Sequence, residues 1–168
     1  MLPAMFFAGI SIPESAWQEL SKTLAATITV ARLARLELTL IVLEADRSAD
    51  QRAAGHWPSA TWRSDLEHAC RQIDHPTKVE LELGPATHAL ILLGCDRKQA
   101  VQFGTDLLLR VRHWSQSGAG GWPTISLGSA TVPHPSPNFD PQGLIDAARR
   151  CLSAAQVSGN GLKSIEIS

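Results

Sequence analysis

Two short stretches carry the residue types that could take part in chemistry. In the first, Glu44-Ala45-Asp46, two carboxylates stand at i and i+2 near the predicted end of a strand. Carboxylate oxygens at the edge of a sheet suit Mg²⁺, so Glu44 and Asp46 form a candidate metal site. The alternative is that both are solvated acids, and we favour it because a third carboxylate is absent.

The second stretch is Gly84-Pro85-Ala86-Thr87-His88, which joins two predicted strands. Glycine next to proline is typical of a turn. The turn contains no carboxylate, no lysine and no Gly-Gly pair, and Pro85 has no backbone N–H to donate to a phosphate. His88 suggests a base, but no motif places a Ser or Cys nucleophile, so we expect an ordinary surface histidine.

Two further groups have chemical residue types without a supporting pattern. His68, Cys70 and His75 are soft-metal ligand types, but residues at i and i+2 of a helix point in different directions and do not converge on one ion. The segment 118–121 is glycine-rich but lacks the Lys and Ser/Thr of a phosphate loop, so we interpret it as a connector.

Composition limits the class of protein. The 168 residues predict one domain, and the 44% hydrophobic content is enough for a sizeable core. The formal net charge of -1 and the absence of a long basic run argue against nucleic acid as the main partner. Cys70, Cys95 and Cys151 lie far apart in apolar contexts, which predicts reduced cysteines and a cytoplasmic location.

The N-terminal segment 1–12 is apolar, lacks a basic region and is too short to span a bilayer. We interpret it as an arm that packs on the domain or takes part in self-association. Ser11 and Glu14 have the spacing of a capping box, which predicts that a helix follows.

Hydrophobic periodicity predicts the elements that position these residues. We expect helices over 13–36, 60–73, 96–114 and 141–157, and strands over 37–44, 79–83, 89–93, 124–132 and 162–167. The fold class is therefore α/β (α+β), with one domain over 13–168. We expect a single mixed five-stranded sheet with a central β-hairpin and helices packed on it.

This order resembles the GGDEF domain, the diguanylate cyclase family of the nucleotide-cyclase fold. The matching pieces are Glu37 to Asp46 (first strand with its D-x-D end), Gly55-His56, Leu83 to Leu90 (the signature hairpin), Thr124 to Ala130 (T-x-S-x-G-x-A) and Ala148 to Asn160 (last helix). The resemblance covers roughly residues 14 to 168, and the T-x-S-x-G-x-A strand is its most specific piece.

The chain departs from this family where the resemblance implies catalysis. Active members are taken to hold two divalent metals on the acidic pair and a turn carboxylate, and GTP phosphates on the glycines and a lysine. In the turn only Gly84 matches: Pro85 replaces the second glycine, Ala86 and Thr87 replace the acids, and His88 replaces the aromatic residue.

Other positions of the resemblance also differ. Arg52 stands near the base-reading asparagine, and the pattern of Arg71 and Asp74 lies too far upstream to be the inhibitory R-x-x-D element. Arg149, Ser153 and Gln156 replace the Asp, Tyr and Lys of the last helix.

We therefore expect a degenerate GGDEF-like domain without cyclase activity, acting as a protein-interaction or regulatory module in bacterial signalling. Losing a metal carboxylate or a phosphate ligand removes several kcal/mol of transition-state stabilisation, and about 1.4 kcal/mol is tenfold in rate. We expect no cofactor, a protein partner or a second copy, no nucleic acid and no membrane span.

Two alternatives remain open. One is a nucleotide sensor that binds GTP or cyclic di-GMP through a metal on Glu44 and Asp46. The other is an active diguanylate cyclase with unusual ligands. Trp57 and Trp122 stand next to prolines in predicted loops, so they mark a partner surface or cap the ends of the core.

Overall fold

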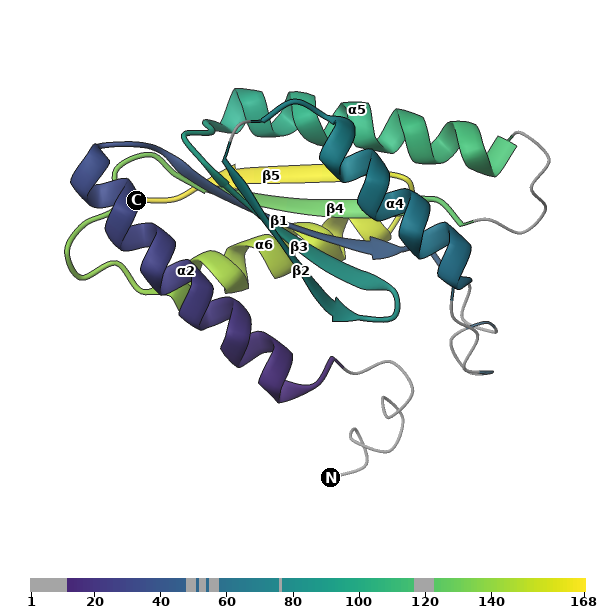
Figure 1. Ribbon diagram of the computed structural model, residues 1–168, viewed down its shortest axis with the longest axis horizontal. Helices are drawn as coiled ribbons and strands as arrows, with labels where there is room; N and C mark the ends of the chain where they lie inside the picture. Colours follow the sequence, from purple (N-terminus) through teal and green to yellow (C-terminus); the bar gives the residue numbers. More distant parts are fainter. Residues whose placement is uncertain (1–11, 48–50, 52–53, 55–57, 76, 117–122) are drawn as a thin grey trace.

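The computed structural model describes residues 12–47, 51, 54, 58–75, 77–116 and 123–168 (Figure 1). Its elements confirm the predicted order of helices and strands. In chain order they are α2 (Glu14–Ala34), β1 (Leu38–Ala45), α4 (Ala60–Gln72), β2 (Lys78–Gly84), β3 (Thr87–Leu93), α5 (Arg97–Gln116), β4 (Ile125–Val132), α6 (Pro141–Gln156) and β5 (Leu162–Glu166).

The strands form one mixed sheet in the order β2-β3-β1-β4-β5. β4 and β5 are parallel, and the other neighbouring pairs are antiparallel. The predicted mixed five-stranded sheet is therefore confirmed, and β1 is its central strand. The hairpin of β2 and β3 is central in the chain, but β2 lies at one edge of the sheet.

Helices cover both faces of the sheet. α4 and α5 pack on one face, and α2 and α6 pack on the other (Figure 1). Alternate residues of β1 enter the two cores: Ile41 and Leu43 pack under α4 and α5, whereas Leu40 and Val42 pack against α2 and α6. Burial on both faces explains why this strand is apolar at almost every position.

α2 begins at Glu14, with Pro13 as its N-cap residue. The predicted capping box would place the N-cap at Ser11, which lies outside the described residues. One face of α2 is apolar and packs on the core, because Leu20, Leu24, Ile28 and Ala31 are all buried. Trp17 is partly buried and packs against the same core.

The three cysteines carry free thiols, as predicted. Cys70 and Cys95 are buried, and Cys151 is partly buried. Burial raises the pKa of the Cys70 thiol to about 12 and that of Cys95 to about 11, so both stay protonated at neutral pH. In the part of the chain that the structure describes, no helix has the length and apolar character needed to cross a membrane.

The hairpin turn is tighter than predicted. β3 begins at Thr87, so only Pro85 and Ala86 stand between the two strands. The prediction of a surface position for His88 is wrong, because its exposed fraction is 7%. His88 belongs to β3 and lies opposite Leu43 of β1, on the face of the sheet that α4 covers.

The burial of His88 changes its acid–base behaviour. Its Nε2 atom is buried without a hydrogen-bond partner among the described residues. Desolvation lowers the pKa of His88, with a smaller contribution from Arg63, while Glu82 and Glu67 act in the opposite direction. The folded state therefore favours the neutral imidazole.

The close packing of α6 on β4 depends on Gly128. A methyl group at this position would overlap backbone atoms of Ala148 and Leu152 in α6. The overlap is with helix backbone, which cannot rotate away as a side chain can. Gly128 therefore sets how closely α6 approaches the sheet.

We expect Gly128→Ala to lower the free energy of unfolding by about 3 kcal/mol or more, because the added methyl group pushes α6 off β4. Urea denaturation followed by circular dichroism measures this change. Gly143→Ala is the matched control, since a Cβ there meets no atom within 4 Å and alanine favours a helix. Equal stability of the two variants would contradict this role of Gly128.

We expect the free energy of unfolding to fall as the pH is lowered from about 7.5 to about 5.5, in part through His88. Below the ordinary pKa of histidine, about 6.5, the unfolded chain binds a proton that the folded His88 resists. His88→Phe should reduce this fall, whereas His134→Gln, at an exposed position, should not. Urea denaturation at both pH values measures the effect, and an identical fall in the wild type and His88→Phe would exclude it.

Candidate functional site

The predicted site residues meet at one end of the sheet, where β1 ends beside the hairpin turn and the start of β4. In the sheet register Glu44 lies opposite Thr87 on one side and Ser126 on the other. Backbone hydrogen bonds fix both neighbours: the Ala45 N–H donates to the Ala86 carbonyl at 2.9 Å, and the Asp46 N–H donates to the Thr124 carbonyl at 2.8 Å. The fold thus brings the end of β1 next to the hairpin turn and the start of β4.

The Asp46 carboxylate accepts three hydrogen bonds from two other segments. Thr124 Oγ1 donates to Oδ2 at 2.7 Å, and Ser126 Oγ donates to Oδ1 at 2.6 Å. The backbone N–H of Asn160 donates to Oδ2 at 2.7 Å. Both carboxylate oxygens are therefore engaged by short, charge-assisted hydrogen bonds.

The loop after α6 is shaped to bring the Asn160 N–H to Asp46. Gly159 and Asn160 have φ values of 70° and 45°, in the left-handed region that glycine and asparagine tolerate best. A Cβ at Gly159 would lie 3.6 Å from Asp46 Oδ2, so the carboxylate packs closely against this turn.

Sequence reasoning missed Thr124, Ser126 and Asn160 as partners of Asp46. A signal was present, because Thr124 and Ser126 have the same i, i+2 spacing as Glu44 and Asp46 and therefore share one face of a strand. The antiparallel pairing of β1 with β4 was needed to place the two pairs at the same end of the sheet.

The turn presents apolar groups where the resemblance implies metal and phosphate ligands. Ala86 is 1% exposed and belongs to the core under α4 and α5, and Thr87 is 5% exposed. Pro85 has no N–H. A Cβ at Gly84 would lie 3.8 Å from the side chain of Ile12, so the chain that leads into α2 lies beside this end of the hairpin.

The Asp46 carboxylate is already engaged by donors of the chain. Thr124, Ser126 and Asn160 occupy three of its about four lone-pair positions, so a metal ion would compete with these donors for the carboxylate oxygens. Within the described ranges, no group of three or more His, Cys, Asp and Glu side chains is arranged to hold a metal. This finding covers His68, Cys70 and His75 as well.

In α6, one of the positions at which the chain departs from the resemblance has a packing role. The Arg149 guanidinium lies 4.4 Å from the centre of the Trp17 ring, a cation–π contact that joins α6 to α2. The predicted interface residues Trp57 and Trp122 lie outside the described residues, as do Arg52, Gly55, His56 and the segment 118–121.

This chain matches known proteins through its structure. No protein-family model matches the chain, and no curated protein matches it. Solved structures do match. The active GGEEF domain of a diguanylate cyclase from Vibrio cholerae has a TM-score of 0.72 and 12% sequence identity, covering 90% of this chain and 97% of that one.

Two further matches come from Pseudomonas aeruginosa. The FimX GGDEF domain has a TM-score of 0.67 and 19% identity, covering 87% of this chain and 90% of that chain. The diguanylate cyclase SiaD, in complex with its activator SiaC, has a TM-score of 0.66 and 15% identity, covering 89% of this chain and 57% of that chain. The chain therefore has the fold of GGDEF domains.

Proposed function

We propose that this chain is a catalytically inactive GGDEF-like domain that serves as an interaction or regulatory module in signalling. The observation that carries the proposal is the Asp46 carboxylate, which is held by Thr124, Ser126 and Asn160 in a fold shared with diguanylate cyclases. Asp46 acts as a structural tie between strands instead of a metal ligand.

The composition of the turn supports the same proposal. Transfer of a phosphoryl-type group depends on positioning and on metal ions that neutralise charge. Between β2 and β3 the chain offers Pro85 and Ala86, which supply no carboxylate and, at Pro85, no backbone donor. The free energy lost with these ligands corresponds to many orders of magnitude in rate, since about 1.4 kcal/mol is tenfold.

An interaction role is consistent with the comparisons. SiaD was solved with a protein activator bound to it. In the present chain, we propose, the scaffold lacks a cyclase site, so recognition of a partner at its surface is the role that the fold serves. A fold by itself does not specify a reaction.

We expect no cyclic di-GMP when the purified chain is incubated with GTP and Mg²⁺ or Mn²⁺, because the turn lacks metal and phosphate ligands. Liquid chromatography with mass spectrometry detects the product. The active GGEEF domain from Vibrio cholerae is the positive control. Cyclic di-GMP formed by this chain above the level of a no-enzyme blank would overturn the proposal.

We expect Asp46→Asn to lower the free energy of unfolding by about 2 kcal/mol or more, because hydrogen bonds to a charged carboxylate are lost and the new amide N–H₂ faces other donors. Urea denaturation measures the loss. Asp106→Asn, on the exposed face of α5, is the matched control and should stay within about 0.5 kcal/mol of the wild type.

The same experiment tests metal binding. A ligand that binds the folded state raises its stability, so Mg²⁺ at millimolar concentration should leave the unfolding midpoint of the wild type unchanged. A stabilisation by Mg²⁺ that disappears in Asp46→Asn would show that Asp46 is a metal ligand and would contradict the structural role.

A further inference from the structure

The two edges of the sheet differ in how their backbone groups are satisfied. At the β2 edge, the Leu93 N–H donates to the Thr77 carbonyl at 3.1 Å, which makes Thr77 and Leu93 a hydrogen-bonded pair. Because such pairs alternate along an antiparallel ladder, the N–H and C=O groups of Lys78, Glu80 and Glu82 point away from β3. These three residues form the open edge of β2.

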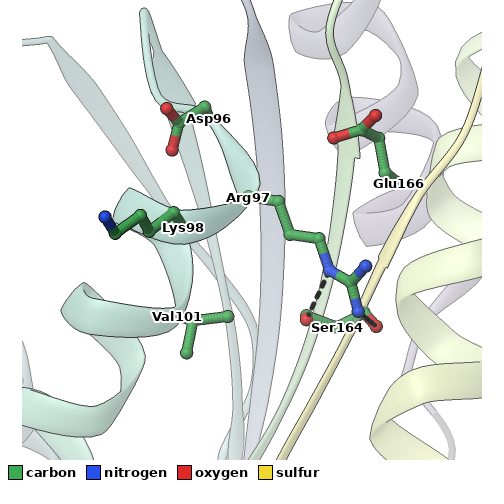
Figure 2. A pocket seen from close by; sticks show the side chains of 6 residues that line it. All are labelled: Asp96, Arg97, Lys98, Val101, Ser164 and Glu166. Atoms are coloured by element: carbon green, nitrogen blue, oxygen red, sulfur yellow. Dashed lines mark hydrogen bonds between the residues drawn. The ribbon is translucent and has the colours of Figure 1, made fainter.

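The opposite edge, at β5, is covered by a side chain. The Gly161 carbonyl and the Ile167 N–H bond to β4, so the backbone of Ser164 points outward. Arg97 of α5 reaches across this edge: its Nε donates to Ser164 Oγ and its Nη2 donates to the Ser164 carbonyl, both at 3.0 Å (Figure 2). A cationic side chain on the outward carbonyl blocks the pairing of another strand.

The β2 edge has no comparable cover among the described residues: none of them donates to the outward carbonyls of Lys78, Glu80 or Glu82. The hairpin runs between α2 and α4, which lie on its two sides (Figure 1). Val79 is 38% exposed, and the Glu82 side chain is 52% exposed. An uncovered edge strand without proline is a template for pairing with another strand.

We propose that β2 pairs antiparallel with β2 of a second copy of this chain, about a two-fold axis at Glu80, so that one sheet continues through both copies. In this register Lys78 lies opposite Glu82 of the second copy, and Val79 lies opposite its Leu81. The outward N–H and C=O groups of Lys78 then face those of Glu82 in the second copy, and the same groups of Glu80 face those of Glu80 in the second copy. Each facing pair can exchange two backbone hydrogen bonds.

The apolar side chains of β2 complement themselves in this register, whereas its charged side chains are compensated within each copy. On the α4 face, Lys78 Nζ donates to the carbonyls of Cys70, Arg71 and Ile73 at the end of α4, and Glu82 lies 3.7 Å from Arg63. Glu80 lies opposite Glu80 of the second copy. In each copy Arg71 lies 3.7 Å from the Glu80 carboxylate and compensates its charge. On the α2 face, Val79 and Leu81 form two apolar pairs. The apolar pairs and the outward backbone groups therefore select the same register.

This inference gives the proposed interaction role a surface and a partner, and in that sense it rests on the proposed function. The two can fail separately. Formation of cyclic di-GMP would overturn the inactive role without touching the β2 pairing, whereas the oligomeric state tests the pairing without reference to turnover.

Sedimentation equilibrium of the whole chain over a concentration series tests the proposal. We expect a reversible dimer whose dissociation constant rises about tenfold or more in Val79→Lys, because lysine then faces the apolar Leu81 of the second copy. Ile165→Lys is the matched control: Ile165 is also 38% exposed and also lies on an edge strand, but on the covered edge. It should dimerise like the wild type.

A second variant keeps the test decisive if Val79→Lys does not fold. Glu80→Pro removes an outward N–H at the centre of the proposed pairing and leaves the β2–β3 ladder intact. It should weaken the dimer by a similar factor, with circular dichroism confirming the fold. A wild-type chain that stays monomeric up to its highest soluble concentration would overturn the proposal. A dimer that survives both β2 variants, or that Ile165→Lys weakens equally, would do the same.

Discussion

The Asp46 carboxylate joins three segments that are distant in the chain. It follows β1, accepts hydrogen bonds from Thr124 and Ser126 at the start of β4, and accepts the Asn160 N–H from the loop between α6 and β5. A partly buried carboxylate needs such donors, because unpaired it would lose its hydration without compensation. The arrangement of this end of the sheet depends on that requirement.

The close contact of α6 with β4 makes this joint possible. Gly128 lets the backbone of α6 approach the strand to a distance that any side chain would prevent. The end of α6 then lies near the end of β1, and the left-handed residues Gly159 and Asn160 turn an N–H toward Asp46. Gly128 in β4 and Asp46 after β1 thus determine the same packing arrangement of α6 on the sheet.

The proposed function depends on what the polar groups at this end of the sheet contact. Asp46 accepts hydrogen bonds from within the chain, while the hairpin turn is a tight Pro85-Ala86 connection whose alanine belongs to the core. His88 is likewise buried, under α4. What remains outward on this hairpin is the edge of β2, and the opposite edge is covered by Arg97. These contacts are the basis of the proposed interaction role.

The sequence alone determined the order of the elements and the apolar character of the turn, because periodicity and residue type are local properties of the chain. The resemblance to GGDEF domains also came from spacing along the chain, and the structure comparisons agree with it at the level of fold. Only the tertiary structure decided what Asp46 contacts, that His88 is buried, and which edge of the sheet is open. These properties depend on the pairing of β1 with β3 and β4 and on the packing of α4 and α6, which are contacts between distant segments. A carboxylate, an imidazole or a strand edge looks the same in sequence whether it is solvated or buried, since its surroundings come from other parts of the chain.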